Sequence, residues 1–144
     1  MAILRLSTQM KKAWRQGFMN ITDYNSTQGN WAYNNNYDMF ITIWDGTIND
    51  YSGSTKLLKM RTYGTASTES GEELITYNSS GTTAATSNGT ATWFHIGVSD
   101  NNYWAYGTVG TDGSGADLMI GTTTLVNGTE YNFSNIVFKF PSAI

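Results

Sequence analysis

Apolar and polar residues alternate with a period of two along most of this chain, which is the pattern of β-strands. One such run covers 39–44, and another covers 135–140 and ends at Pro141. Further runs are predicted at 56–63, 72–77, 92–99, 103–109 and 116–120. Clusters of Gly, Asn, Ser and Asp separate the runs at short intervals. Seven or eight short strands with tight turns predict a mainly β fold, a single β-sandwich or jelly-roll-like domain.

Two of the predicted strands carry large side chains on both faces. In the run 39–44, isoleucines alternate with Thr42 and Trp44, which suits a strand covered on both sides. In the run 92–99, Phe94 shares one face with Ile96 and Val98, whereas Trp93 and His95 share the other with Gly97.

Residues 8–18 follow a helical period instead. One stripe of the predicted helix is apolar and comprises Met10, Ala13, Trp14, Gly17 and Phe18. The opposite side is basic and comprises Lys11, Lys12 and Arg15. We expect an N-terminal arm at 1–20 with a short amphipathic helix, followed by the β-sandwich domain at 21–144. This helix either covers one end of the sheet or docks on an acidic partner.

Composition limits the chemistry that the 144 residues can carry. The chain has no cysteine, which excludes disulfides, thiol nucleophiles and cysteine-ligated metals. Its net charge is −3, although the first twenty residues hold four cations and no acid. This balance disfavours nucleic acid as a partner. No apolar run reaches the length of a membrane span, and the first residues lack the apolar core of a signal peptide. We therefore expect no membrane partner and synthesis in the cytoplasm.

Few residues are candidates for catalysis or metal binding. His95 is the single histidine and lies mid-strand, where a half-buried structural histidine is the ordinary outcome. Glu72 and Glu73 are adjacent on a predicted strand and so face opposite ways. Asp112 and Asp117 flank a Gly-Ser-Gly turn but lack the acid spacing of a calcium loop. We predict no catalytic residue, no metal site and no cofactor, and we expect that the chain is not an enzyme.

Two groups of aromatic residues are candidates for recognition. One lies in an Asn-rich stretch and comprises Trp31, Tyr33 and Tyr37. The other lies in or beside a predicted loop and comprises Tyr103, Trp104 and Tyr106. Rigid aromatic side chains give much contact area for little lost entropy. They either fill the ends of the core, form a protein interface or stack on sugars.

Several short segments, spread in order over nearly the whole chain, carry a resemblance to a known family. They are Ala2–Thr8 before the predicted helix, Met39–Trp44, Gly53–Leu58, Gly89–Ile96, Gly113–Leu118 and Val137–Pro141. In this order the chain resembles a family of small virion proteins of tailed bacteriophages. That family often carries a proline soon after the first strand, whereas Asn49–Gly53 has none, which leaves the role of this loop open. The resemblance implies a β-rich, non-enzymatic component of the virion.

Within that class, we expect a capsid cement or decoration protein that binds between major capsid protein subunits. The resemblance also implies a homo-oligomer, with a trimer as the first expectation, located in the virion. The alternatives are a neck or tail component, or a carbohydrate-binding module that uses Trp31, Tyr33 and Trp104. The candidate interface residues are Lys11, Lys12, Trp14, Arg15, Phe18, Trp31, Tyr33, Tyr37, Tyr103, Trp104 and Tyr106.

Overall fold

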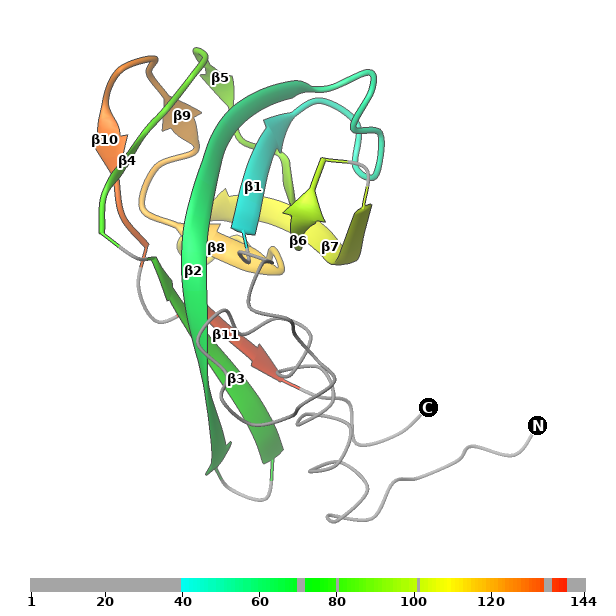
Figure 1. The fold of residues 1–144 in the computed structure, drawn as a ribbon, viewed down its shortest axis with the longest axis vertical. Helices are drawn as coiled ribbons and strands as arrows, with labels where there is room; N and C mark the ends of the chain where they lie inside the picture. Colours follow the sequence, from blue (N-terminus) through cyan, green and yellow to red (C-terminus); the bar gives the residue numbers. More distant parts are fainter. Residues whose placement is uncertain (1–39, 70–71, 80, 101, 134–135, 140–144) are drawn as a thin grey trace, which may run out of the picture.

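The computed structural model describes residues 40–69, 72–79, 81–100, 102–133 and 136–139 (Figure 1). Within them every regular element is a strand, which confirms the mainly β prediction. The strands are β1 (Phe40–Asp45), β2 (Thr55–Glu69), β3 (Glu72–Ser79), β4 (Thr83–Ala84), β5 (Gly89–Thr90), β6 (Trp93–Ser99), β7 (Asn102–Thr111), β8 (Leu118–Ile120), β9 (Thr124–Leu125), β10 (Glu130–Tyr131) and β11 (Ile136–Lys139). The predicted arm, its helix and the aromatic group at 31–37 lie outside the described residues.

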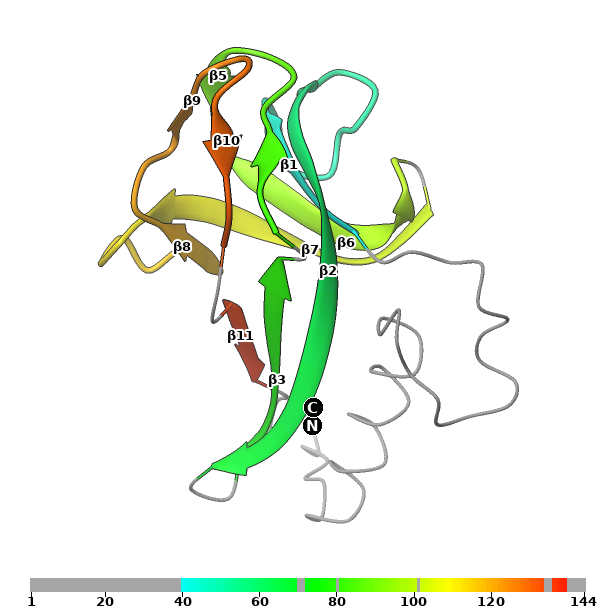
Figure 2. The same cartoon turned by 60° about the vertical axis from the view of Figure 1, so that its left-hand side comes forward.

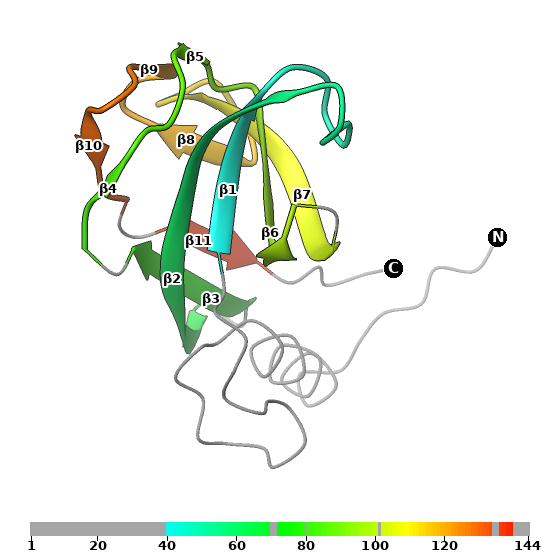
Figure 3. The same ribbon diagram turned by 45° about the horizontal axis from the view of Figure 1, so that its top comes forward.

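Seven of these strands form one sheet in the order β11-β3-β2-β1-β6-β7-β8. Neighbouring strands are antiparallel except for β7 and β8, which are parallel. The sheet curls into half of a barrel (Figures 1 and 2). Its long strand β2 pairs with β1 over its first part and with β3 over its second. Two further sheets have two strands each, β4 with β10 and β5 with β9. Figure 3 shows them beside the curled sheet at the end where β1 and β2 are connected.

The apolar core lies on the inner face of the curled sheet. The strands contribute buried Ile41, Ile43, Leu57, Leu58, Met60, Phe94, Ile96, Val109, Leu118, Ile120 and Ile136. Ala85, Ala91 and Leu125, from the segments that form the small sheets, are buried in the same cluster, with Tyr131 and Phe133 packed against it. One continuous core therefore joins all three sheets. Burial of its apolar surface is the main term that stabilises the fold.

A β-bulge in β2 sets which side chains face outward. Ile43 pairs with Leu58, but the next residue of β1, Trp44, pairs with Lys56, so β2 holds an extra residue at this point. That residue is Leu57, and both leucines are fully buried in the core. The bulge thereby keeps two leucines inside and leaves Lys56 in register with Trp44.

The predicted strands differ from the observed ones mainly in β2. The run at 56–63 was expected to end at Tyr63, but β2 continues to Glu69 and pairs with β3 from Thr62 onward. Hydrogen bonding to β3 extends the strand through a Thr-, Ser- and Gly-containing segment that has no alternating pattern. The four two-residue strands of the small sheets were not predicted, because two residues are too few to show a period.

Candidate interaction surfaces

The outer face of β1 and β6 carries a second, aromatic cluster. Thr42 pairs with His95, and Trp44 pairs with Trp93, so these four side chains share one face. The two indole rings are stacked, with centroids 5.5 Å apart and an interplanar angle of 12°. All four residues are at most 3% exposed. The predicted separation of Phe94 and Ile96 from Trp93 and His95 is confirmed, and so is the covering of the first strand on both sides.

His95 is held in one orientation by Trp44. The indole Nε1 of Trp44 donates a hydrogen bond of 3.0 Å to Nδ1 of His95, so the neutral ring carries its proton on Nε2. Burial lowers the pKa of His95 to about 4, because the charged ring loses its hydration. With 1% of the residue exposed and Nδ1 already engaged, these contacts favour a structural role for His95 over general base catalysis.

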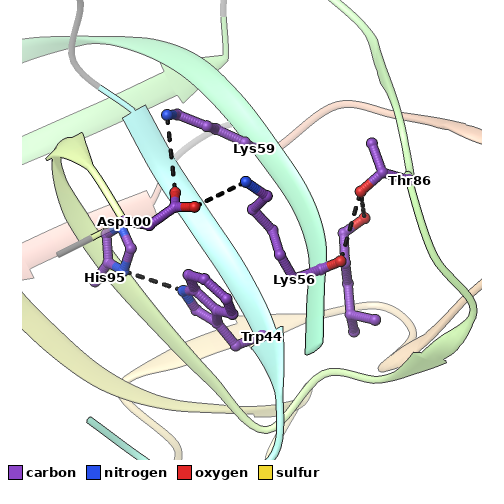
Figure 4. A network of polar contacts seen from close by, with 7 residues as sticks. Trp44, Lys56, Lys59, Thr86, His95 and Asp100 are labelled. Carbon is purple, nitrogen blue, oxygen red and sulfur yellow. Dashed lines mark hydrogen bonds and ion pairs between the residues drawn. The ribbon is translucent and has the colours of Figure 1, made fainter. Parts of the chain in front are cut away.

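An ion-pair cluster lies next to this histidine (Figure 4). Lys56 Nζ is 2.8 Å from Asp100 Oδ2, and Lys59 Nζ is 3.9 Å from Asp100 Oδ1. Lys59 also lies over the ring of Phe40, 4.7 Å from its centroid. The three charged side chains are about one-third exposed. Asp100 raises the pKa of His95 while the two lysines lower it, so their opposing effects leave burial as the dominant cause.

Asp117, one of the acidic residues considered as candidate ligands, has a structural partner. Asp117 Oδ2 accepts hydrogen bonds from the backbone N–H of Thr108 at 2.8 Å and from its hydroxyl at 2.9 Å. Gly113 and Gly115 have positive φ angles of 81° and 80°, which the tight turn between β7 and β8 requires. In the described part of the chain, no three His, Asp or Glu side chains are grouped to hold a metal ion.

Hydrogen bonds tie three loops together at one end of the molecule (Figure 1). We name this surface the loop end and define it as residues 46–54, 85–92 and 121–129. Thr92 accepts from Gly46 N and donates to Gly46 O, and Ala91 N donates to Thr123 O. Asn127 N donates to Asn88 Oδ1 at 2.8 Å. The loop end is therefore a connected network rather than three independent loops.

The β1–β2 loop within the loop end is fixed internally as well. Asp50 Oδ1 accepts from Gly53 N at 3.0 Å and from the Ser52 hydroxyl at 3.3 Å. Trp93 Nε1 donates to Ser54 Oγ at 3.1 Å, which links the loop to the outer aromatic cluster. Asn49 has a φ of 63°, in the left-handed region that few residues other than glycine adopt. These contacts hold the loop in one conformation.

The described surface exposes large apolar side chains in two places. Ile48, Tyr51 and Val126 are 42%, 39% and 49% exposed on the loop end. Tyr106 and Met119 are 52% and 49% exposed on β7 and β8. Because Tyr106 pairs with His95 and Gly110 pairs with Met119, both of these residues lie on the outer face of the sheet. We call this second group the outer patch.

The structure tests only part of the predicted interface. Tyr103, Trp104 and Tyr106 belong to strand β7, which begins at Asn102 directly after the β6–β7 turn, so the group lies on a strand beside a loop. Tyr106 is exposed. The other eight predicted residues lie outside the described ranges. Sequence reasoning missed Ile48, Tyr51, Val126 and Met119, although Ile48 and Tyr51 flank an Asn-Asp turn and Val126 precedes an Asn-Gly turn.

Comparisons with known proteins find no relative: no family model, no curated protein and no solved structure matches the chain. Among the described residues there is no helix of the length and hydropathy that crossing a membrane requires.

Proposed function

We propose that this chain is a structural protein of a bacteriophage virion, most specifically a capsid cement protein that binds between major capsid protein subunits. The supporting observation is the presence of two separate exposed apolar groups, the loop end and the outer patch, on one rigid β fold. A protein that joins neighbouring subunits needs more than one contact surface. Exposed large apolar residues on a small domain are candidates for such contacts.

The mode of action that we propose is the burial of added interface. Each large apolar side chain that leaves water contributes roughly 1.5–3 kcal/mol before the cost of ordering is subtracted. The outer patch is suited to the capsid contact, because Tyr106 and Met119 project from paired strands whose backbone is already ordered. Repeated over many copies, this contribution would stabilise a shell against internal pressure.

We also propose a sandwich-like description of the domain. The two small sheets would form the second layer, since Ala85, Ala91 and Leu125, from the segments that form them, are buried in the same core as the curled sheet. A sandwich of this kind leaves loops clustered at its ends, where binding residues are commonly found.

The decisive experiment adds the purified chain to phage capsids that lack it and measures co-sedimentation and capsid survival on heating. We expect saturable binding at a copy number of hundreds per particle and a higher disruption temperature. Tyr106→Ala combined with Met119→Ser should weaken binding, whereas Thr82→Ala, an exposed site outside both the outer patch and the loop end, should not. Saturation at a handful of copies would instead assign the chain to the neck or tail. Tryptophan quenching by a polysaccharide, without capsid binding, would support the carbohydrate-binding alternative.

A further inference from the structure

The loop end combines apolar side chains with negative charge. Ile48, Tyr51 and Val126 are exposed on it, Asp50 lies within it, and Asp45 and Glu130 flank it. No Lys or Arg occurs in 45–55, 85–92 or 121–130. The nearest lysine in the sequence, Lys56, is paired with Asp100. A matching partner therefore presents apolar side chains together with cations.

The loop end also meets the energetic requirement for a docking surface. Its three segments are joined by hydrogen bonds, and Asp50, Ser54 and Thr92 fix the β1–β2 loop from within and from the neighbouring strands. Binding to a surface that is already ordered loses little conformational entropy. Exposed apolar residues on an ordered loop therefore contribute more to binding free energy than the same residues on a flexible loop.

The chain itself contains a segment with the matching chemistry. Residues 1–20 hold four cations and no acid, and residues 8–18 combine Lys11, Lys12 and Arg15 with the apolar Met10, Trp14 and Phe18. The 21 residues 19–39 separate this segment from β1 and can span up to roughly 70 Å when extended. That reach exceeds the roughly 30 Å diameter of a small domain. β1 begins at Phe40, at the end of the strand away from the loop end (Figure 1), so residues 19–39 join the described fold on the side opposite to this surface.

We infer that the loop end of one copy binds residues 8–18 of a second copy of this chain. The apolar residues of the two surfaces supply the affinity, and the opposite charges set orientation and association rate. The contact is heterologous, so copies related by a rotation that closes form a ring, of which the trimer is one case. The inference goes beyond the proposed function and does not depend on it, since it concerns only how copies of the chain associate.

The test uses the full chain with a photoreactive side chain at Tyr51. Isotope-labelled and unlabelled copies are mixed, irradiated and digested, and cross-linked peptides are identified by mass spectrometry. We expect cross-links that join position 51 of one isotope to residues 8–18 of the other. Cross-links confined to one copy, cross-links to other segments, or a chain that sediments as a monomer at every concentration would overturn the inference.

Matched variants separate docking from folding. Ile48→Ser should weaken self-association by about tenfold or more, as at an interface hot spot. Met119→Ser, at a similarly exposed position of the outer patch, should leave self-association unchanged. Charge reversal at Lys11 and Lys12 should weaken association, and Glu130→Lys in the partner copy should restore part of it. Unaltered melting temperatures would show that each variant folds. Self-association without capsid binding would contradict the proposed function alone, and capsid binding by a monomer would contradict this inference alone.

Discussion

The two faces of the central strands β1 and β6 are both buried, but they are held together by different interactions. The inner face packs aliphatic side chains and Phe94 into the core. The outer face stacks two tryptophans, places a neutral histidine beside them and borders an ion-pair cluster that is about one-third exposed. Adjacent residues of the same strand therefore experience two kinds of environment.

This difference separates the factors that stabilise the fold. The inner face depends on apolar area and packing, which respond little to pH. The outer face depends on a hydrogen bond between specific ring atoms and on the neutral state of His95. We expect the two faces to respond differently to truncation, to pH and to removal of single polar groups.

The largest effect is expected from Phe94→Ala on the inner face. Phe94 is 2% exposed, and its removal leaves a cavity in the core. The free energy of unfolding should fall by about 3–5 kcal/mol, measured by urea denaturation. Tyr106→Ala on the neighbouring strand is the control, since its half-exposed ring should change stability by no more than about 1 kcal/mol. Similar losses for both variants would contradict the assignment of Phe94 to the core.

The second effect is a pH dependence that comes from the outer face. Folding lowers the pKa of His95 from 6.5 to about 4, so folding favours the neutral ring. The stabilisation is complete above pH 6.5, is lost as the pH falls toward 4, and is then constant. A shift of this size corresponds to about 3 kcal/mol.

The measurement compares unfolding free energies of the native chain and His95→Gln between pH 4 and 7. Carboxylates titrate in both proteins, so the difference between the two curves isolates the histidine. Gln retains an acceptor for the Trp44 N–H but does not titrate. Parallel curves would show that His95 does not contribute to the pH dependence.

Trp44→Phe removes one hydrogen bond while keeping an aromatic ring. Nδ1 of His95 then loses the donor that stabilises the neutral ring, at a cost of about 2 kcal/mol. The pKa of His95 should rise, because the neutral form loses its partner. Urea denaturation measures the stability, and NMR of the ring protons measures the pKa. An unchanged pKa would mean that the hydrogen bond is not formed in solution.

Thr42→Val is expected to stabilise the protein. The side chain of Thr42 is buried in the middle of the outer face, and its hydroxyl finds no hydrogen-bond partner among the described residues. Replacing the hydroxyl by a methyl group should add about 1 kcal/mol to the unfolding free energy. Thr108→Val, which breaks the contact with Asp117, should lower stability and serves as the opposite case. Destabilisation by both variants would point to a solvent partner for Thr42.

The smallest effect is expected from Asp100→Asn. Its partners Lys56 and Lys59 are about one-third exposed, so the loss in stability should lie within about 1 kcal/mol and shrink at high salt. The pKa of His95 should fall further, because Asp100 is the charge that raises it. Asp112→Asn, in the exposed β7–β8 turn, should change neither quantity. A loss of several kcal/mol would contradict the solvent exposure of this cluster.

The alternating pattern predicts the central strands well because one residue determines the face of the next. This is why the two faces of β6 and the burial of both faces of β1 follow from the sequence. The extension of β2 beyond Tyr63 could not be predicted from the sequence, since residues 64–69 have no alternation of apolar and polar positions. Their conformation is determined by pairing with β3. The two-residue strands also depend on pairing with partners far along the chain.

The interaction surfaces could be predicted less well than the strands. Exposure of Ile48 and Tyr51 depends on a loop conformation that Thr92 and Trp93 fix from about 40 positions away. A local pattern contains no information about such contacts. Tyr106 could be predicted as a candidate, because it belongs to an aromatic group in or beside a predicted loop, but its exposed position required the register with His95.

The pairing of β11 with β3 has a consequence for how the protein is made. Ile136 pairs with Tyr77 and Lys139 pairs with Leu74, a separation of roughly 60 positions that adds to the contact order of the fold. A ribosome adds residues from the N-terminus onward, so β3 must wait for its outer partner until the roughly 60 residues between them have been synthesised. Ile136 joins the core at the same moment. A nascent chain stalled before β11 would therefore present the unpaired edge of β3 to chaperones and to other chains.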